Sequence, residues 1–368
     1  MRLLHVHSGN LYGGVESMML TLARESARTA KIAHEFAIAF DGRIACELRS
    51  AGVPVHLMGS VRVRNPLSAW RARRRLKRLL KAQRFDAVIC HMPWNHAIFA
   101  GVVRRARRPL VFWMHGATTG RHWTELWAAL TPPDLALCNS RFTASMLPLI
   151  FPRVPPHVIY CPVAIPDERP IRSRALELRD ELATARDAVV IVQVGRMESL
   201  KGHAALLHAL APLRDRNWIC WQAGAAQRPH ERAYVDGLRR LADELGIGDR
   251  VKFLGHRSDI ARVLAAADIY CQPNSAPDAF GLSFIEALGA GLPVVTTAIG
   301  GAIEIVDETC GVLVAPDDKA ALAGALGRLI DDIDFRHRLG AAGPARAKAL
   351  CDPPAILREI ASLIEELH

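Results

Sequence analysis

The sequence predicts an α/β fold built from two similar halves, each with a parallel sheet covered by helices. Short apolar segments alternate with helix-length segments along the whole chain, which is typical of parallel sheets. The chain has 368 residues, more than the roughly 250 to 300 residues that one hydrophobic core usually serves. A proline-rich passage near residue 160 offers a place to divide the chain.

The apolar segments give the strand order expected in each half. In the first half they are residues 3–7, 36–40, 53–58, 87–90, 110–114, 135–138 and 158–160. In the second half they are residues 189–194, 218–222, 251–254, 269–271, 294–296 and 312–314. We therefore expect domains at residues 1–165 and 166–350, with a last helix in residues 351–368 that can cross back to the first domain.

Composition narrows the class of protein. Half of the residues are apolar, and no stretch approaches the roughly 18 uninterrupted apolar residues of a membrane span. The eight cysteines are scattered without metal-type spacing, which indicates reduced core residues of a cytosolic protein. The apolar run at the start of the chain is too short, and is followed too early by polar residues, to be the apolar core of a signal peptide. No aromatic-interleaved basic module is present, so nucleic-acid binding is not expected.

Positive charge is concentrated in the first half. Residues 1–168 hold 23 Lys/Arg against 10 Asp/Glu, a net +13, whereas residues 169–368 hold 24 against 27, a net −3. The densest basic run, residues 65–84, has Leu67, Trp70, Leu76, Leu79 and Leu80 near helical spacing. Such a helix either covers a sheet with a solvated cationic face or also meets anionic lipid headgroups.

Three loops that follow strands carry candidate binding residues. Gly13 and Gly14 allow the backbone to approach a phosphate or sugar, although the spacing is not the dinucleotide fingerprint and an ordinary tight turn is the alternative. His115 follows the fifth strand, where open α/β sheets bind ligands; His5, His34 and His56 are expected to pack or to face solvent. Arg196 and Lys201 lie on a loop flanked by Gly195 and Gly202, which suits a diphosphate or, alternatively, a solvated pair.

A fourth loop precedes a helix and has an acid at each end. Asp278 lies in the loop and Glu286 on the helix, and Gly281 between them permits close approach of a ligand. A helix start of this kind favours an anion. Loops of this composition occur in any doubly wound sheet, but a helix that only packs needs no acid at both ends.

In this order, the Gly13-Gly14-Val-Glu, His115-Gly, Gly195-Arg-x4-Lys201-Gly and Asp278-x7-Glu286 motifs resemble glycosyltransferase family 4. The resemblance covers essentially the whole chain and is strongest in residues 194–301. It implies a retaining glycosyltransferase with the GT-B fold, in which two Rossmann-like domains face each other across a central cleft.

The resemblance also implies roles for the candidate residues toward a nucleotide-sugar donor. Arg196 and Lys201 would neutralise the diphosphate, with Gly195 in the same loop, and the amides of Gly13 and Gly14 would approach the same phosphates. Asp278 would hold the sugar together with the amides of Ala279, Phe280, Gly281 and Leu282. Glu286 would accept the ribose hydroxyls, and His115 would contact the sugar near its reacting carbon. Arg257 lies in the segment where such enzymes bind the base.

The implied chemistry needs neither a metal nor another cofactor. The acceptor hydroxyl attacks from the face that the diphosphate leaves, so no carboxylate nucleophile is required. Two positions depart from the family pattern: Asp278 replaces the usual Glu, and Cys161-Pro162-Val163 replaces the usual Asn-containing linker motif. Asp278 is one methylene shorter than Glu, so the sugar contact is expected to be shifted or partly lost, and the replacement alters either the choice of donor or the activity.

We therefore expect transfer of a hexose-type sugar to a glycan or lipid-linked acceptor, in cell-envelope or polysaccharide biosynthesis. The expected location is cytoplasmic, with peripheral binding to the inner face of a membrane through the basic first domain. Two alternatives remain: a sugar-nucleotide-binding subunit without transfer activity, and a sugar-nucleotide epimerase on the same fold.

Overall fold

The computed structural model of the 368-residue chain describes all residues except 11, 29–30, 63, 166–171 and 227. The chain divides into two compact units. The N-terminal unit contains residues 1–164 together with residues 351–368, and the C-terminal unit contains residues 165–350. The N-terminal unit is thus built from two separate stretches of chain.

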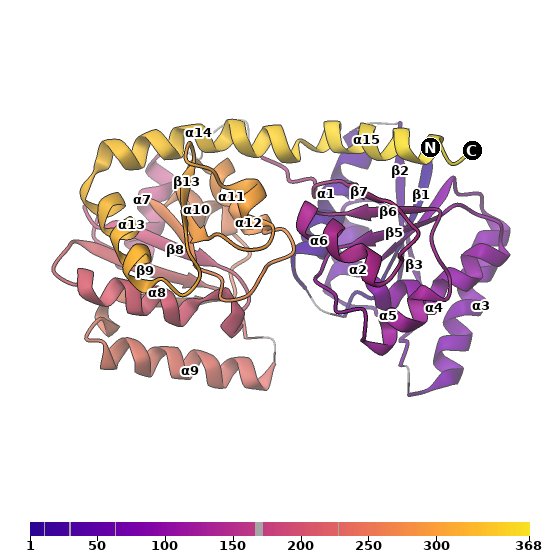
Figure 1. Ribbon diagram of the computed structural model, residues 1–368, viewed down its shortest axis with the longest axis horizontal. Helices are drawn as coiled ribbons and strands as arrows, with labels where there is room; N and C mark the ends of the chain where they lie inside the picture. Colours follow the sequence, from indigo (N-terminus) through magenta and orange to yellow (C-terminus); the bar gives the residue numbers. More distant parts are fainter. Residues whose placement is uncertain (11, 29–30, 63, 166–171, 227) are drawn as a thin grey trace. The chain divides into compact units, whose positions relative to one another are not determined.

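The N-terminal unit is organised around a seven-stranded parallel sheet with the order β3-β2-β1-β4-β5-β6-β7 (Figure 1). The chain runs outward from β1 in one direction and then, from β4, in the other, as in a doubly wound fold. The strands are β1 (Arg2–His7), β2 (Ala33–Ile38), β3 (Val55–Leu57), β4 (Ala87–His91), β5 (Leu110–Met114), β6 (Leu135–Cys138) and β7 (Pro156–Val158).

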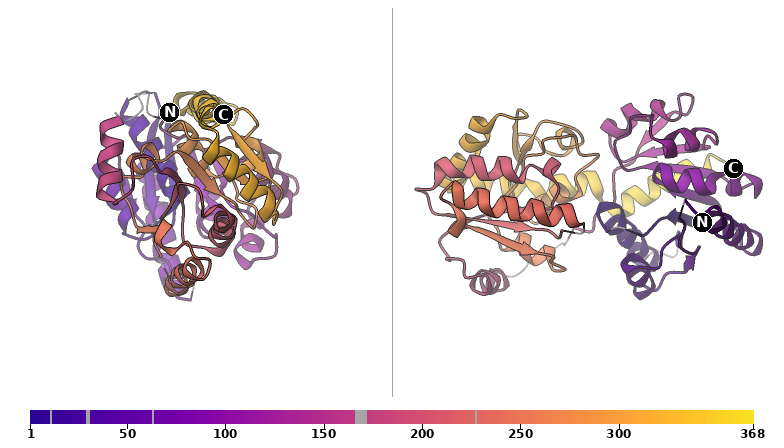
Figure 2. Two further views of the ribbon diagram at one scale, coloured as in Figure 1. Left: turned by 90° about the vertical axis from the view of Figure 1, so that its left-hand side faces the viewer. Right: turned by 90° about the horizontal axis from the view of Figure 1, so that it is seen from below.

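Helices cover both faces of this sheet, as right-handed crossovers in two directions require (Figures 1 and 2). One group consists of α1 (Gly14–Arg28), α2 (Arg43–Ser50) and α15 (Pro353–Glu365). The other consists of α3 (Pro66–Ala82), α4 (Met92–Arg105) and α5 (Trp123–Ala129), and α6 (Arg141–Met146) follows β6. Leu4 and Val6 of β1 pack with Leu76 of α3 in one core cluster, so the alternate residues of β1 point toward the group that contains α1.

Two details differ from the sequence-based expectation. The last strand was predicted at residues 158–160, whereas β7 is Pro156–Val158; a proline is tolerated as the first residue of an edge strand because no ladder donor is needed there. On α3, Leu76 and Leu80 are buried as expected, but the side chains of Leu67 and Trp70 are 60% and 54% exposed. The apolar face of α3 therefore extends beyond the part that covers the sheet.

The C-terminal unit contains a six-stranded parallel sheet with the order β10-β9-β8-β11-β12-β13 (Figure 1). The strands are β8 (Val189–Val194), β9 (Trp218–Ala223), β10 (Val251–Gly255), β11 (Ile269–Gln272), β12 (Val294–Thr297) and β13 (Gly311–Val314). Because the chain reverses direction between β10 and β11, the carboxyl ends of β8 and β11 lie side by side at the centre of the sheet.

Helices contact one another in two groups in this unit as well. The first contains α8 (His203–Leu210), α9 (Pro229–Glu244) and α13 (Lys319–Asp331), and the second contains α7 (Arg172–Glu181), α10 (Ile260–Ala265), α11 (Leu282–Gly289) and α12 (Ala302–Ile305). The long α14 (Ile333–Cys351) leads to the last stretch of the chain. No helix among the described residues has both the length and the apolar character needed to cross a membrane.

Candidate functional site

Every candidate residue predicted from the sequence lies at, or just beyond, the carboxyl end of a strand or on the helix that follows it. This is the edge at which open α/β sheets bind ligands. In the C-terminal unit, Gly195, Arg196 and Lys201 follow β8, Arg257 follows β10, and residues 278–282 lead from β11 into α11, which carries Glu286. In the N-terminal unit, Gly13 and Gly14 follow β1 and His115 follows β5.

The structure brings Lys201 and Asp278 together, although they are 77 residues apart in the sequence. Nζ of Lys201 donates to Oδ2 of Asp278 at 2.5 Å, and the two side chains are 14% and 23% exposed. A partly buried ion pair of this kind holds both side chains in one arrangement. The predicted diphosphate-binding cation and the predicted sugar-binding acid thus form one unit at the junction of β8 and β11.

The loop after β8 is fitted closely against the loop after β11. Gly202 has a φ of +73°, and a Cβ atom on it would lie 1.7 Å from the carbonyl oxygen of Pro273. The backbone amide of Ser275 also donates to the carbonyl of Leu200 at 3.0 Å. Only glycine fits at position 202, because any side chain would strain the backbone and push the two loops apart.

Arg196 has a carboxylate partner of its own. Its Nη1 lies 2.7 Å from Oε1 of Glu198, and the arginine side chain is 40% exposed. Each of the two predicted phosphate-binding cations is therefore paired with a carboxylate. A phosphate group that used either cation would have to compete with Glu198 or Asp278 for it.

Glu286 stands apart from these ion pairs. It is partly buried on α11, and desolvation raises the pKa of its carboxyl group to about 7. A carboxyl group with a pKa near neutrality can change between a hydrogen-bond acceptor and a donor at physiological pH. Perturbation of this kind is common at functional sites.

The start of α11 is fixed by the turn that follows β12. The backbone amide of Gly301 donates to the carbonyl of Asp278 at 2.9 Å, and the amide of Ala279 donates to Oδ1 of Asp278 at 3.0 Å. Gly281 is the N-cap residue of α11, and Leu282 is its first helical residue, while Phe280 is buried beneath the loop. The positive end of the α11 dipole therefore lies three residues after Asp278 in the chain.

A buried polar network supports these loops, and sequence reasoning missed it. Nε2 of Gln193 donates to the carbonyl of Lys201 at 2.7 Å. The hydroxyl of Tyr270 donates to Gln272, whose amide donates in turn to Oδ1 of Asn274 at 3.0 Å. The available signal was a polar residue near the end of an otherwise apolar strand, in β8 at Gln193 and in β11 at Gln272.

A pocket of about 400 Å³ adjoins the β8 loop, at the carboxyl ends of β8, β9 and β10. Its wall includes Met197 next to Arg196, the segment 224–226, Phe253, Gly255 and His256. Arg257, which the sequence suggested for this region, forms a bidentate pair with Asp259 (Nε to Oδ1 2.8 Å, Nη2 to Oδ2 2.5 Å) and is not among the residues that line the pocket. The neighbouring His256 does line it.

In the N-terminal unit, Gly13 is occupied by a local contact. Its backbone amide donates to Oε2 of Glu16 at 2.9 Å, and the other oxygen of Glu16 lies 2.7 Å from Nε2 of the buried His7. Gly14 begins α1. A phosphate that uses the amide of Gly13 would therefore have to replace the carboxylate of Glu16.

His115 is only 8% exposed, although it is a loop residue. Its Nε2 lies 2.9 Å from Nδ1 of His91, at the end of β4. Desolvation lowers the pKa of His115 to about 3. His115 is consequently neutral throughout the physiological range, with one ring nitrogen engaged by another histidine.

Comparison with known protein families agrees with the two-unit architecture. Residues 12–165 match Glycosyltransferase Family 4, and residues 175–346 match Glycosyl transferases group 1. The two sheets and the positions of their strand-end loops define a two-domain α/β protein of the GT-B class. The chain belongs to the family 4, or group 1, glycosyltransferases.

Curated relatives match part of the chain. The D-inositol 3-phosphate glycosyltransferase of Corynebacterium efficiens is 36% identical over 182 residues, which is 46% of this chain and 42% of the relative. The protein of the same name from Corynebacterium jeikeium is 40% identical over 180 residues, with the same two shares. The matched stretch thus spans less than half the length of these relatives.

Solved structures resemble the whole chain. HepE of Anabaena, determined in complex with UDP, has a TM-score of 0.86 and 24% identity, with 100% of both chains covered. A glycosyltransferase from Rickettsia africae has a TM-score of 0.86 and 19% identity, with 99% of this chain and 98% of that chain covered. At these identities the likeness establishes the fold.

Proposed function

We propose that this protein is a retaining glycosyltransferase that moves a hexose-type sugar from a nucleotide sugar to a glycan or lipid-linked acceptor. The observation that carries the proposal is the Lys201–Asp278 pair, which lies at the same sheet edge as Glu286 and the β8–β10 pocket. A cation, an acid, a helix start and a pocket on one edge match the parts of a nucleotide sugar: diphosphate, sugar, ribose and base.

Stabilisation of the leaving diphosphate is the main contribution that we assign to this site. As the bond between the sugar carbon and the phosphate oxygen breaks, negative charge grows on the diphosphate. Lys201, Arg196 and the start of α11 would neutralise that charge, and preorganised groups do so at little reorganisation cost. Glu286 would accept hydrogen bonds from the ribose, and Asp278 would hold sugar hydroxyls.

We further propose that the sugar keeps its anomeric configuration. The acceptor hydroxyl attacks the anomeric carbon from the face that the diphosphate leaves, and its proton passes to a phosphate oxygen of the leaving group. His115 would contact the sugar near this carbon as a neutral ring. In this scheme the bonding electrons go to the diphosphate, and neither a metal nor a cofactor takes part.

Donor and acceptor classes follow from the relatives as proposals. HepE was solved with UDP and with UDP-glucose, so a uridine nucleotide is the first donor to test. The curated relatives carry inositol 3-phosphate in their names, so a phosphorylated polyol joins the glycan and lipid-linked acceptors. The replacement of the usual Glu by Asp278 is expected to affect the choice of sugar.

A donor screen tests the function. UDP-, GDP- and ADP-glucose would be compared by calorimetric binding and by slow hydrolysis, with the native protein and with Arg196→Ala and Glu286→Ala. We expect one nucleotide to bind and to be turned over, with both variants impaired. Binding without turnover under any acceptor would instead favour a binding subunit, and conversion of the sugar without acceptor would favour an epimerase.

Binding to an anionic membrane surface is a separate part of the proposal. Leu67 and Trp70 are exposed on α3, and the guanidinium of Arg74 lies 5.2 Å from the Trp70 ring centre. An exposed apolar edge on a basic helix is typical of interfacial binding. Sedimentation with anionic and neutral vesicles should show preference for anionic ones, and the double variant Leu67→Ala/Trp70→Ala should weaken it. Equal binding to both vesicle types would reject this part.

A further inference from the structure

Four histidines form a continuous hydrogen-bonded array across the N-terminal sheet. Nε2 of His5 lies 2.8 Å from Nδ1 of His34, Nδ1 of His5 lies 2.9 Å from Nε2 of His91, and Nδ1 of His91 lies 2.9 Å from Nε2 of His115. The rings come from β2, β1, β4 and the end of β5, four strands that are neighbours in the sheet. We call His34, His5, His91 and His115 the histidine array.

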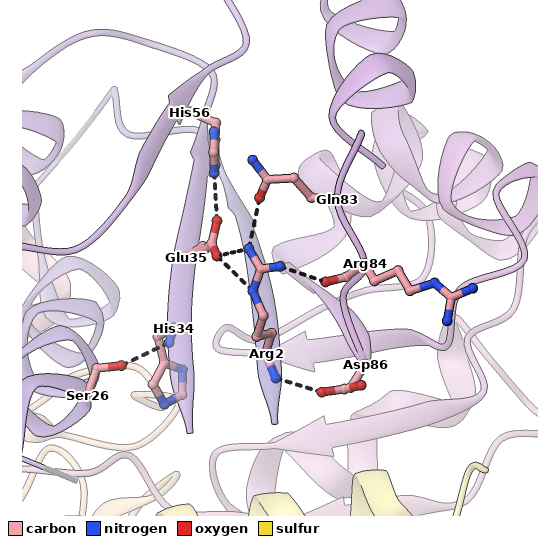
Figure 3. Close-up of polar contacts among 8 residues, drawn as sticks. All are labelled: Arg2, Ser26, His34, Glu35, His56, Gln83, Arg84 and Asp86. Atoms are coloured by element: carbon pink, nitrogen blue, oxygen red, sulfur yellow. Dashed lines mark hydrogen bonds and ion pairs between the residues drawn. The ribbon is translucent and has the colours of Figure 1, made fainter. Parts of the chain in front are cut away.

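The array leads from the interior of the sheet to the candidate site. His34 is the second residue of β2, near the amino end of the strand, and its backbone amide is held by Oγ of Ser26 on α1 (Figure 3). Its neighbour Glu35 turns to the opposite face, where it binds Arg2 and His56 (Figure 3). Successive ring centres are 5.0, 5.2 and 5.1 Å apart, and the last ring is that of His115.

All four rings are buried and uncharged. Their exposed fractions are 1%, 0%, 0% and 8% from His34 to His115, and desolvation is the first cause of the lowered pKa of each. A neutral imidazole has one N–H donor and one bare nitrogen acceptor. Each of the three contacts therefore needs one proton, from one ring or from the other.

All three contacts join Nδ1 of one ring to Nε2 of the next, so the rings are oriented head to tail. If His91 carries its proton on Nδ1, then His5 and His34 must carry theirs on Nδ1 to donate along the array, and His115 must do the same. If His91 carries its proton on Nε2, the other three rings must also carry theirs on Nε2. Only these two arrangements satisfy all three hydrogen bonds; any mixture places two protons or two lone pairs face to face.

Both ends of the histidine array have an unused ring nitrogen. Within the described part of the chain, Nδ1 of His115 and Nε2 of His34 are buried atoms without a hydrogen-bond partner. In one arrangement Nδ1 of His115 is a donor, and in the other it is an acceptor. Nε2 of His34, at the other end of the histidine array, is an acceptor in the first arrangement and a donor in the second.

We propose that His34, His5 and His91 are positioning residues that set the tautomer of His115, so that a substrate group that reaches the buried Nδ1 meets a defined donor or acceptor. That Nδ1 meets a sugar hydroxyl rests on the proposed function, whereas the coupling of the four tautomers does not. A substrate group that must accept from His115 would select the all-Nδ1–H arrangement, and a group that must donate would select the all-Nε2–H arrangement.

Imidazole ¹⁵N NMR of the ligand-free protein tests the coupling, because protonated and bare ring nitrogens give separate signals. His96 provides an internal reference: its Nε2 lies 2.7 Å from the carbonyl of Thr131, so it must carry its proton there. We expect the four rings of the array to show the same tautomer populations. Unlike tautomers in two hydrogen-bonded rings would overturn the proposal, even if no variant folds.

Two variants sharpen the test. In His34→Phe the three remaining rings should still share one tautomer population, and in His5→Phe the linked pair His91 and His115 should agree while His34 becomes independent. The matched control is His96→Phe, another buried histidine of the same unit, which should leave the His115 signals in place. Unlike tautomers of His91 and His115 in His34→Phe or in His5→Phe, or a change of the His115 tautomer in the control, would mean that the array only packs.

A kinetic readout separates positioning from packing. His91→Phe removes the partner of His115, and we expect kcat for turnover of UDP-glucose to fall about tenfold or more, with a smaller change in KM and with a smaller loss in His96→Phe. Equal losses in the two variants would overturn the positioning role. Coupled tautomers in a protein that turns over no nucleotide sugar would instead reject the proposed function and leave the coupling standing.

Discussion

The two units hold polar groups on or just after the strands of similar parallel sheets, charged in one unit and neutral in the other. In the C-terminal unit the groups are ions: Lys201 with Asp278 and Arg196 with Glu198. In the N-terminal unit they include four hydrogen-bonded neutral imidazoles that end at His115. Charged side chains suit the binding of a diphosphate, whereas neutral imidazole rings can orient a hydrogen bond without adding charge. Two sheets of one fold class can thus carry different chemistry.

The ionic side of this comparison predicts the largest effect. Lys201→Ala removes one of the two proposed diphosphate-binding cations and the ion-pair partner of Asp278, so the rate of transfer should fall by about 10²- to 10³-fold. Steady-state kinetics with the donor identified by screening would measure it. The control Lys319→Ala removes an exposed lysine at the start of α13. A similar loss in that variant would show that overall charge, and not this site, governs the rate.

The fit between the β8 and β11 loops predicts the next effect. Gly202→Ala should lower the free energy of unfolding by about 3 kcal/mol or more, since it adds a backbone clash to the strain of a positive φ. Gly246→Ala is the matched control, because its φ is +69° with nothing within 4 Å of an added Cβ. There we expect about 1 kcal/mol. Denaturant titration would compare them, and equal losses would mean that the loop contact adds nothing.

The neutral side of the comparison predicts acid sensitivity of the N-terminal unit. An unfolded histidine takes up a proton near pH 6.5, whereas burial lowers the folded pKa of His34 and of His96 to about 4. Between these values only the unfolded chain is protonated, so stability falls as the pH drops below 6.5. Each such ring should cost about 2 kcal/mol at pH 5 relative to pH 7.

Hydrogen exchange of core amides, corrected for intrinsic rates at each pH, would measure this loss unit by unit. Five histidines with lowered pKa lie in the N-terminal unit, and His203 is one in the C-terminal unit. In the C-terminal unit the raised pKa of Glu286 has the opposite effect on stability. The folded protein takes up this proton at a higher pH than the unfolded chain does, so this group stabilises the fold as the pH drops. Equal loss of protection in both units would contradict the comparison.

The smallest effect concerns nucleotide binding and pH. If Glu286 accepts ribose hydrogen bonds as a carboxylate, affinity for UDP should fall as the pH drops below about 7, by at most about tenfold per pH unit. Glu286→Gln cannot titrate and should lose this component while keeping any that belongs to UDP itself. Calorimetry of both proteins between pH 8 and pH 6 would give the difference. Parallel profiles would exclude Glu286 from the binding equilibrium.

Much of the fold followed from the sequence because its signals are local. Alternating apolar segments located the strands, and the residues just after them became site candidates from local features: His115 from its place at a strand end, Lys201 from a glycine-flanked loop with two cations, and Asp278 from an acid at each end of a loop and helix. Their direct contact was not predictable, since the separation of 77 residues says nothing of register. The exposure of Leu67 and Trp70 was missed because helical spacing defines an apolar face but not how much of it the sheet covers.

The histidine array could not be predicted for a related reason. His5 and His34 look like isolated polar residues within strands, and sequence reasoning assigned them to packing or to solvent. Their alignment depends on the register of β1 with β2 and β4, a long-range property. Single residues that interrupt apolar strands were the only local signal, in His5 as in Gln193 and Gln272 of the other unit.

The discontinuity of the N-terminal unit has a consequence for biosynthesis. Its helix α15 contacts α1 and buries Ile356, Leu357, Ile360 and Ile364, and the amide of Val163 bonds to the carbonyl of Cys351. A ribosome completes residues 165–350 before it reaches α15, so the unit translated first is the last to be complete. During translation, the apolar surface of α1 therefore stays uncovered until α15 has been made. The side of the nascent chain that α15 later covers is the side most exposed to chaperones or to aggregation.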